Sequence, residues 1–159
     1  MPLVYIGLGS NKGDKEKNIK KALGYLKKKI KVHKVSSLYL TEPVGVEGGW
    51  FVNCALEGET EKKPKNLLQE LLQIEYRMGR RRTGTKGSRV IDLDLLLYGE
   101  MVSYEEDLIL PHPRLHKRKF VLIPLIEINP HLYHPVLRKP LKAILNTLED
   151  PHQVKKIIH

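Results

Sequence analysis

The chain has 159 residues, a length that suits one domain, and its 41% hydrophobic and 29% charged residues are typical of globular proteins. No run of about 18 apolar residues occurs, so the sequence argues against a membrane-spanning helix. The formal net charge of +10 favours an anionic partner, and nucleic acid, a membrane surface and a nucleotide all meet that condition.

Cysteine usage and the first residues bear on location. The single Cys54 cannot form a disulfide within the chain, and because it lies in an apolar run we expect a buried thiol. The start, Met1 to Gly7, has neither the charged segment nor the cleavage site of a signal peptide. Together these features predict a cytoplasmic protein.

The chain begins with a predicted strand and helix. Residues 3–8 are apolar and rich in β-formers, and they run into a glycine-rich turn, Gly7 to Asp14. Asp14 can cap the helix that follows, whose apolar residues recur at helical spacing as far as Ile30. Lysines cover the other face of this helix, which we interpret as solvated surface.

Two more strands and a second helix are expected next. The strands should occupy residues 31–40 and 50–57, with a loop rich in glycine at residues 41–49 between them. The helix should begin at Pro64 and end before Gly79.

Glu75 falls on the apolar face of this second helix. An acidic side chain on a core-facing stripe is usually paired or functional. Because a basic loop begins five residues later, we expect an ion pair between Glu75 and an arginine of that loop.

The most unusual stretch of the chain joins a basic loop to an acidic strand. The loop carries six cations and no acid: Arg77, Arg80, Arg81, Arg82, Lys86 and Arg89. Its glycines predict mobility. The strand, residues 90–98, contains Asp92 and Asp94, which should share one face because side chains alternate along a strand. Core positions are expected on the other face, at Ile91, Leu93, Leu95 and Leu97.

This combination indicates a chemistry. Two carboxylates this close repel by about 2–3 kcal/mol at the effective dielectric of a protein surface, so a cation should lie between them. Mg²⁺ takes one or two carboxylates and fills its remaining positions with water and substrate phosphates. The acid pair beside a basic loop therefore predicts a magnesium–nucleotide phosphoryl-transfer site. The alternative interpretation is an edge strand with a solvated acidic face next to a basic surface loop.

The last third of the chain contains a second chemical segment and two predicted helices. Residues 107–120 place two His, two Arg and two Lys between prolines and a new apolar run. The first helix should span residues 120–128, with Pro124 in its first turn, and the second residues 141–148. We assign no role to the tail from Val154.

The order strand, helix, strand, strand, helix, strand predicts an α+β fold of the ferredoxin-like, split-βαβ type. We expect one domain, residues 1–159, in which helices pack over one face of an antiparallel or mixed sheet and extra helices follow at the carboxyl end.

Two motifs resemble those of one family. The run Arg89-Val90-Ile91-Asp92-Leu93-Asp94-Leu95-Leu96 is similar to the signature of hydroxymethyl-dihydropterin pyrophosphokinases, which act in folate biosynthesis. Pro111-His112-Pro113, followed by Arg118 and Phe120, is similar to a second family motif, and Asn11 lies in a matching Gly-Ser-Asn segment that should organise its loop. The resemblance covers nearly the whole chain. It implies transfer of pyrophosphate from ATP to the hydroxymethyl group of 6-hydroxymethyl-7,8-dihydropterin, with AMP as the other product.

The resemblance also implies roles for the residues that match. Two Mg²⁺ ions would be held by Asp92 and Asp94. The catalytic groups that face the phosphates would be Arg82, Arg89, His112 and Arg118. The nucleotide would be bound by Glu75, Arg80, Lys86, His112 and Arg118. The pterin would be bound by Thr41, Val44, Phe51, Asn53, Asp94 and Phe120.

The chain departs from the family pattern in the basic loop. Lys86 stands where the family usually has a Trp, Thr85 where it has a basic residue, and the loop is one residue shorter. Glu42 stands where a Pro is common. We therefore expect weaker or differently gated closure of residues 80–88 over the pterin.

Two other functions remain open from the residues themselves. A ferredoxin-like fold of this charge could be an RNA-binding module, although the aromatic motif of that class is missing from the sequence. A metal-dependent nuclease could also use an acid pair and a basic loop. Our expectation is a monomer whose partners are ATP and the pterin, with no nucleic acid and no membrane partner.

Overall fold

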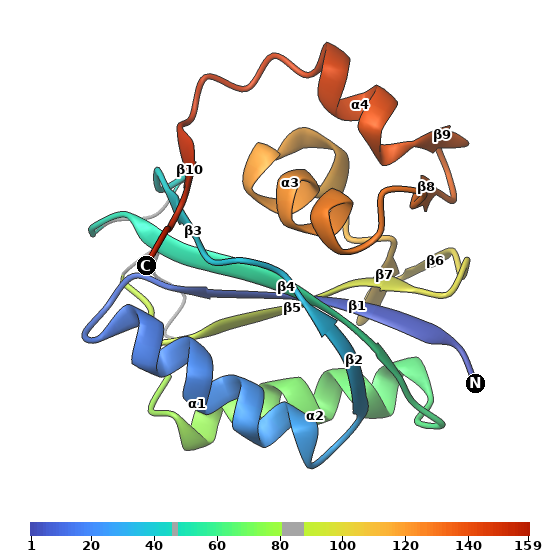
Figure 1. The fold of residues 1–159 in the computed structure, drawn as a ribbon. Helices are drawn as coiled ribbons and strands as arrows, with labels where there is room; N and C mark the ends of the chain where they lie inside the picture. The colour runs from blue at the N-terminus through green and yellow to red at the C-terminus, as the bar shows by residue number, and fades with distance from the viewer. Residues whose placement is uncertain (46–47, 81–87) are drawn as a thin grey trace.

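A computed structural model describes residues 1–45, 48–80 and 88–159, and its centre is a sheet of six antiparallel strands. The strand order is β10-β3-β4-β1-β5, and β2 also pairs with β4 (Figure 1). These strands are β1 (Leu3–Ser10), β2 (Lys31–Val35), β3 (Tyr39–Thr41), β4 (Phe51–Glu59), β5 (Asp92–Tyr98) and β10 (Val154–Lys156). Two small hairpins follow β5, formed by β6 (Ser103–Glu105) with β7 (Leu108–Leu110) and by β8 (Tyr133–His134) with β9 (Lys139–Pro140).

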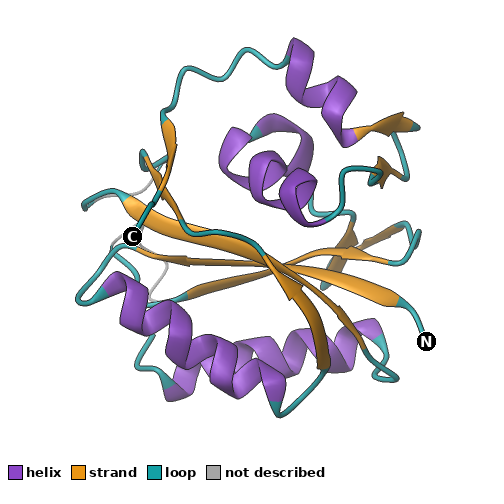
Figure 2. Ribbon diagram, in the orientation of Figure 1, coloured by secondary structure: helices purple, strands orange, loops and turns teal. Residues whose placement is uncertain are grey.

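Helices cover both faces of the sheet (Figure 2). One face carries α1 (Lys15–Lys27) and α2 (Pro64–Arg77), and the other carries α3 (Lys119–Ile128) and α4 (Leu141–Thr147). A 3₁₀ turn, η1 (Leu115–Lys117), precedes α3. Each face has its own apolar cluster, so the sheet is buried on both sides. Of the two kinds of sheet expected, antiparallel or mixed, the structure has the antiparallel one, and the additional carboxyl-terminal helices are confirmed.

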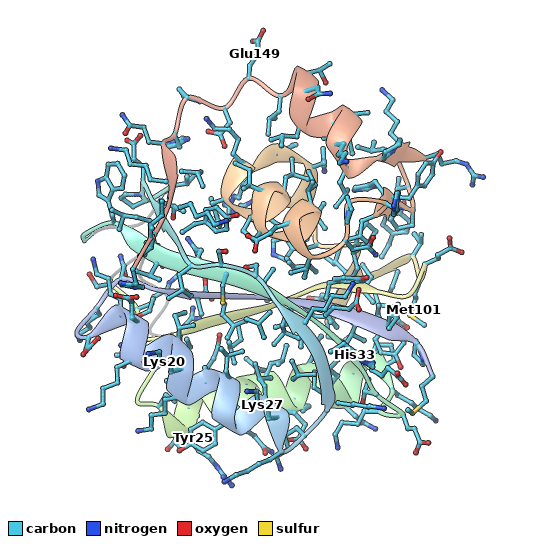
Figure 3. All side chains as sticks on the ribbon, in the orientation of Figure 1. Lys20, Tyr25, Lys27, His33, Met101 and Glu149 are labelled. Atoms are coloured by element: carbon cyan, nitrogen blue, oxygen red, sulfur yellow. The ribbon has the colours of Figure 1, made fainter. Side chains whose placement is uncertain are left out.

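The first two helices form where the sequence predicts them. The Asp14 carboxylate accepts a hydrogen bond from the Lys17 backbone N–H at 3.2 Å and so caps α1. Gly79, with φ of +92°, takes the left-handed conformation that follows α2. Lys20 and Lys27 of α1, labelled in Figure 3, are exposed to solvent, as expected of a solvated face.

Three details of the predicted elements are wrong. The single strand expected at residues 31–40 is two strands, β2 and β3. Leu97 belongs to the apolar cluster under α3 rather than to the cluster of Leu93 and Leu95, because a register shift in the β1–β5 pairing interrupts the alternation. Pro124 lies inside α3 rather than in its first turn, because the helix begins at Lys119.

None of the helices in the described part of the chain combines the length and the apolar character that crossing a bilayer requires.

Candidate active site

A cavity opens on the α3 side of the sheet, at the end where β1 runs into α1. Its floor is formed by β1, β4 and β5, and the start of α3 and the segment after β3 form its walls. The predicted residues that line it are Thr41, Val44, Phe51, Asn53, Arg89, Asp92, Asp94, Arg118 and Phe120. Nine residues predicted from sequence motifs far apart in the chain therefore lie around one cavity.

Two glycines of β1 make room for this cavity. Gly7 is paired with Asp94 of β5 and Ala55 of β4, and Gly9 is paired with Asp92 and Asn53. Glycine inside a strand often marks a place where another group approaches the backbone closely. The prediction of a glycine-rich turn at these positions missed this role, because β1 continues to Ser10. Their i, i+2 spacing, which places both on one face of a strand, was the available signal.

Two aromatic side chains from different elements line the cavity. Phe51 comes from the start of β4, and Phe120 comes from the first turn of α3. The guanidinium carbon of Arg118 lies 5.5 Å from the centre of the Phe120 ring, within the range of a cation–π contact. The two rings and the adjacent cation suit a flat, polar heterocycle.

Asn53 supplies the polar group on the floor. Its Nδ2 donates a hydrogen bond to Thr41 Oγ1 at 2.5 Å, so the two predicted pterin-binding side chains contact each other. Both are nearly inaccessible to solvent. This fixes the direction of the amide, whose Oδ1 then lies beside Gly9.

Asp92 and Asp94 both line the cavity, which confirms that they share a face of β5. The pKa of Asp94 is raised to about 7 by its burial and by the nearby charges of Asp92 and Glu75, against the opposing influence of Arg118 and Arg80. Water still reaches this carboxylate, since 40% of its side chain is exposed. An acid in this environment is stabilised in its charged form when a cation binds beside it.

The donor set fits a divalent cation. Two carboxylates on one face, at the floor of a cavity that also holds arginines, match the way Mg²⁺ binds jointly to protein and phosphate oxygens. Within the described ranges, no three or more His, Cys, Asp and Glu side chains gather to form a cation site of their own. The protein would therefore offer Asp92 and Asp94, and the phosphates would supply further oxygens.

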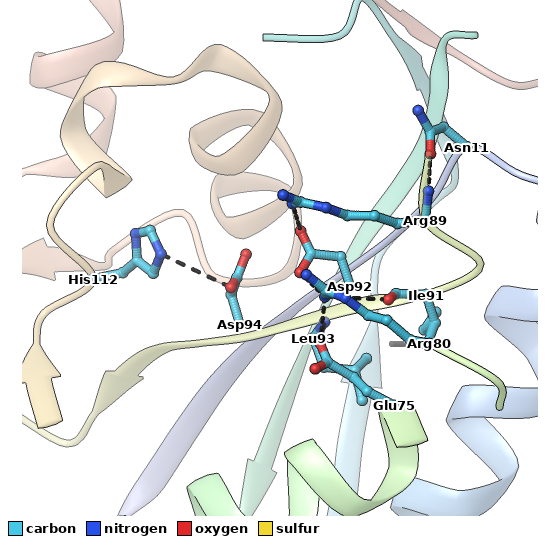
Figure 4. A network of polar contacts seen from close by, with 9 residues as sticks. All are labelled: Asn11, Glu75, Arg80, Arg89, Ile91, Asp92, Leu93, Asp94 and His112. Carbon is cyan, nitrogen blue, oxygen red and sulfur yellow. Dashed lines mark hydrogen bonds and ion pairs between the residues drawn. The ribbon is translucent and has the colours of Figure 1, made fainter. Parts of the chain in front are cut away.

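A buried network holds Asp92 in place (Figure 4). Arg80 Nη1 donates to Asp92 Oδ1 at 2.6 Å and to Glu75 Oε2 at 2.8 Å, and only 8% of the Arg80 side chain is exposed. The same Glu75 oxygen accepts the Leu93 backbone N–H at 2.8 Å. The predicted ion pair between Glu75 and an arginine is confirmed. Neither Glu75 nor Arg80 lines the cavity, so their role in this arrangement is to hold Asp92 and the Leu93 backbone in position.

Arg89 connects the acid pair to the loops at the cavity rim. Its Nη1 donates to Asp92 Oδ2 at 3.2 Å, and its backbone N–H donates to Asn11 Oδ1 at 2.6 Å. The Asn11 Nδ2 donates in turn to the Gly49 carbonyl at 3.2 Å. Asn11 thus joins the loop before β4 to the segment before β5, which confirms the loop-organising role expected of it.

His112 lies next to Asp94 at the free edge of β5, where its backbone N–H donates to the Leu96 carbonyl. Its Nε2 lies 3.9 Å from Asp94 Oδ1, and its Nδ1 accepts the Arg114 backbone N–H at 3.2 Å. Burial and the charge of Arg118 lower the pKa of His112 to about 4. The ring is therefore neutral at pH 7, with its proton on Nε2, the nitrogen that faces Asp94.

A second cavity adjoins the first beyond the edge of β5. It lies between α2 and β7, and it is lined mainly by aliphatic side chains such as Leu68, Leu72 and Leu95. Asp94 lines both cavities, and His112 lines the second. The sequence prediction missed this cavity because helix and hairpin are far apart in the chain and meet only in the fold. Arg82 and Lys86, the remaining predicted residues, lie outside the described residues.

Comparison with known proteins agrees with this geometry. Residues 5–130 match the family model described as 7,8-dihydro-6-hydroxymethylpterin-pyrophosphokinase. The chain is 41% identical over 152 residues to the 2-amino-4-hydroxy-6-hydroxymethyldihydropteridine pyrophosphokinase of Aquifex aeolicus, an alignment that covers 94% of this chain and 95% of that protein. It is 45% identical over 129 residues to the enzyme of the same name from Bacillus subtilis, which covers 79% and 77% respectively.

The chain is also similar to parts of longer proteins. The chain is 43% identical over 149 residues to the folic acid synthesis protein fol1 of Schizosaccharomyces pombe, with 92% of this chain but 20% of that protein covered. The crystal structure of Plasmodium falciparum HPPK-DHPS A437G with STZ-DHP has the same fold over 91% of this chain and 45% of that one, at a TM-score of 0.74 and 15% identity. These comparisons support neither the RNA-binding module nor the nuclease. The chain belongs to the 7,8-dihydro-6-hydroxymethylpterin-pyrophosphokinase family.

Proposed function

We propose that the chain transfers a pyrophosphoryl group from ATP to 6-hydroxymethyl-7,8-dihydropterin, with the pterin in the first cavity and the nucleotide in the second. The observation that carries the proposal is that Asp94 lines both cavities. Two substrates bound on either side of Asp94 would meet at the acid pair.

The first cavity suits the pterin. Phe51 and Phe120 offer the two faces on which a flat ring can stack, and each such stacking contact contributes about 0.5–1.5 kcal/mol beyond the burial itself. The Asn53 amide and Thr41 provide donor and acceptor groups for the polar edge of the ring. The hydroxymethyl group would then lie toward Asp94.

The second cavity suits the nucleotide. Its leucines can pack against the base, and the phosphates would lie toward Asp94 and His112, which also line it. Arg89 and Arg118 line the first cavity close to this point, so cations surround the place where the transferred group passes. We propose that Arg89 exchanges its contact with Asp92 for a phosphate oxygen when ATP binds.

The chemical step follows from this arrangement. The hydroxymethyl oxygen forms a bond to the β-phosphorus while the bond from that phosphorus to the oxygen bridging the α-phosphate breaks. AMP leaves with the bridging oxygen, and the hydroxyl proton passes to solvent. Arg89 and Arg118 stabilise the charge on the moving group, and the neutral His112 donates a hydrogen bond from Nε2. Two Mg²⁺ ions, our expected number, would be held by Asp92 and Asp94 and would neutralise phosphate oxygens.

We also propose that the fold is of the ferredoxin-like, split-βαβ type. This is supported by the sheet core, in which β1 lies between β4 and β5 and both helices α1 and α2 cover one face. The buried single Cys54 supports a reducing compartment such as the cytoplasm. That the chain acts as a monomer, binds no nucleic acid and has no membrane partner stays a prediction.

The test is product analysis with MgATP, with and without hydroxymethyl-dihydropterin, on the wild type and on Asp94→Asn. We expect AMP that depends on the pterin and that nearly disappears in the variant. ADP in place of AMP would indicate an ordinary kinase. AMP formation at the same rate with and without the pterin would overturn the proposal.

A further inference from the structure

The carboxyl-terminal segment, residues 150–157, runs across the molecule from the start of α3 to the outer edge of the sheet (Figure 1). It follows α4 and ends in β10, which pairs with β3. The match to the family model stops at residue 130, so this segment lies beyond the part of the chain that the family model describes. We call residues 150–157 the strap.

One end of the strap holds the start of α3. This helix has no side-chain cap of its own, because Arg118 occupies its N-cap position. Asp150 takes that role from 31 residues away, since its Oδ2 accepts the Lys119 backbone N–H at 3.0 Å. Lys119 lies between Arg118 and Phe120, which both line the pterin cavity.

Asp150 is itself firmly held. Its side chain is 6% exposed, and Oδ1 accepts the His152 backbone N–H at 3.0 Å and lies 2.6 Å from His152 Nδ1. Although burial acts in the opposite direction, these hydrogen bonds and the one from Lys119 lower the pKa of Asp150. A buried carboxylate with three such partners fixes the position of the groups that donate to it.

The other end of the strap holds the opposite wall. The Gln153 backbone N–H donates to Glu42 Oε1 at 2.6 Å, and the Glu42 backbone N–H donates to the Gln153 carbonyl at 3.1 Å. Residues Val154 to Lys156 then continue the pairing along β3, where Val154 lies opposite Thr41. Thr41 and Glu42 both line the cavity.

We propose that the strap sets the distance between the two walls of the pterin cavity, and that Asp150 is a positioning residue for Arg118 and Phe120. One short segment bonds to the α3 wall at Lys119 and to the β3 wall at Thr41 and Glu42. The hydrogen bonds and strand pairing of the strap join it to the walls of the first cavity, so its effect on binding should fall on the pterin and not on ATP. A displaced Arg118, which faces the moving group, should lower kcat. The identity of the substrate in this inference rests on the proposed function. The link that the strap makes between the two walls does not depend on it.

The test compares three variants by steady-state AMP formation. Asp150→Ala removes the cap of α3, and we expect KM for the pterin to rise about threefold to tenfold and kcat to fall, with KM for ATP unchanged within about twofold. Asp150→Asn retains an oxygen that can accept the Lys119 N–H, and it should recover most of the pterin affinity. Glu149→Ala makes the same change of charge at the adjacent exposed residue, which points away from the body in Figure 3, and it should behave as wild type.

A double-variant cycle tests whether Asp150 acts through the α3 wall. In a Phe120→Ala background, Asp150→Ala should change KM for the pterin by less than in the wild type, because the side chain it positions is gone. Equal effects in both backgrounds, or equal increases in KM for ATP and for the pterin, would overturn the inference. A fall in thermal stability with unchanged pterin KM would show a merely structural strap and would also overturn it.

Hydrogen exchange provides a measurement that needs no substrate. In Asp150→Ala the amides of residues 119–122 and 39–42 should exchange faster, while those of α2 should not. If the wild type makes no pterin-dependent AMP, the proposed function fails, and hydrogen exchange alone then tests whether the strap holds the two walls. Unchanged exchange at both walls would refute the inference about the strap.

Discussion

Gly9 and Asn53 face each other across the β1–β4 pairing, and the Asn53 Oδ1 lies only 2.4 Å from the place that a β-carbon at position 9 would take. The ring of Phe51 closes the same space, with Cδ2 3.3 Å from that point. The strand therefore needs glycine here for a reason of packing: Gly9 leaves room for the Asn53 amide and the Phe51 ring at the cavity floor.

Gly9→Ala should consequently displace Asn53 and impair pterin binding. We expect KM for the pterin to rise about tenfold or more and the free energy of unfolding to fall by about 1–3 kcal/mol, as is usual for overpacking. Kinetics and urea unfolding measure the two effects. Gly24→Ala is the control, because Gly24 is exposed on α1 with open space around it, and alanine there should be neutral or stabilising. An unchanged pterin KM in Gly9→Ala would contradict this account of the floor.

Asp94→Asn should lose activity and gain stability. Because the folded-state pKa of Asp94 is raised to about 7, folding favours its protonated form, and its ionisation destabilises the protein progressively from about pH 4 until it is complete above about pH 7. Removal of the Asp94 charge should add about 1–2 kcal/mol to the free energy of unfolding at pH 8. This gain in stability is reduced by solvent screening, because 40% of the side chain is exposed. The value of kcat should fall about a hundredfold or more.

Urea unfolding in EDTA at pH 8 and at pH 4 measures this stability difference, which should vanish at the lower pH. Added Mg²⁺ should stabilise the wild type more than the variant, because the cation favours two charged carboxylates. A variant that is less stable than the wild type at pH 8 would show that the repulsion between the acids does not matter.

Glu127 should make stability depend on acid pH. Its carboxylate on α3 accepts hydrogen bonds from Tyr39 Oη at 2.5 Å and from the Ser37 backbone N–H and Oγ at 2.9 Å. Burial acts to raise the pKa of Glu127, but these hydrogen bonds outweigh it and lower the pKa. The stabilisation is therefore present above the unfolded-state pKa of about 4.3 and is lost as pH falls through the lower folded-state value.

Glu127→Gln should reduce the free energy of unfolding by about 0.5–1 kcal/mol at pH 7, a value kept small because Glu127 is exposed to solvent, and the deficit should shrink below about pH 4. Denaturant titrations at pH 7 and pH 3.5 give the comparison, with Glu149→Gln, the same change at another exposed residue, as the control. A deficit of the same size at both pH values would mean that charge on Glu127 contributes nothing.

Short-range rules recovered much of the site from the sequence. Asp92 and Asp94 share a face because strand geometry alone dictates it, and the pairing of Glu75 with an arginine follows from an acid on an apolar stripe. Phe51 and Phe120 line one cavity although they are 69 positions apart in the chain, so only the family resemblance could predict that they lie together. Their roles toward the pterin stay predictions.

What the sequence did not reveal depends on contacts between distant segments. The cap that Asp150 gives to α3, the second Arg80 contact to Asp92 and the cavity between α2 and β7 all arise only when the chain has folded. Leu97 was assigned to the wrong face of β5 for a local reason. A bulge in the β1–β5 pairing interrupts the alternation of side chains between the two faces, and the pattern of hydrophobic residues does not reveal it.

The position of the nucleotide can be tested by filling the second cavity. Leu72 lines that cavity from α2 and is 40% exposed, so Leu72→Trp should occupy space meant for the base without disturbing the core. We expect KM for ATP to rise about tenfold, KM for the pterin to stay the same, and the free energy of unfolding to change by less than about 1 kcal/mol. Gln73→Trp introduces the same side chain at the next, exposed position outside the cavity and should leave both constants alone. Equal ATP constants in the two variants would place the nucleotide elsewhere, and Asp94 would then no longer be the point at which the two substrates meet.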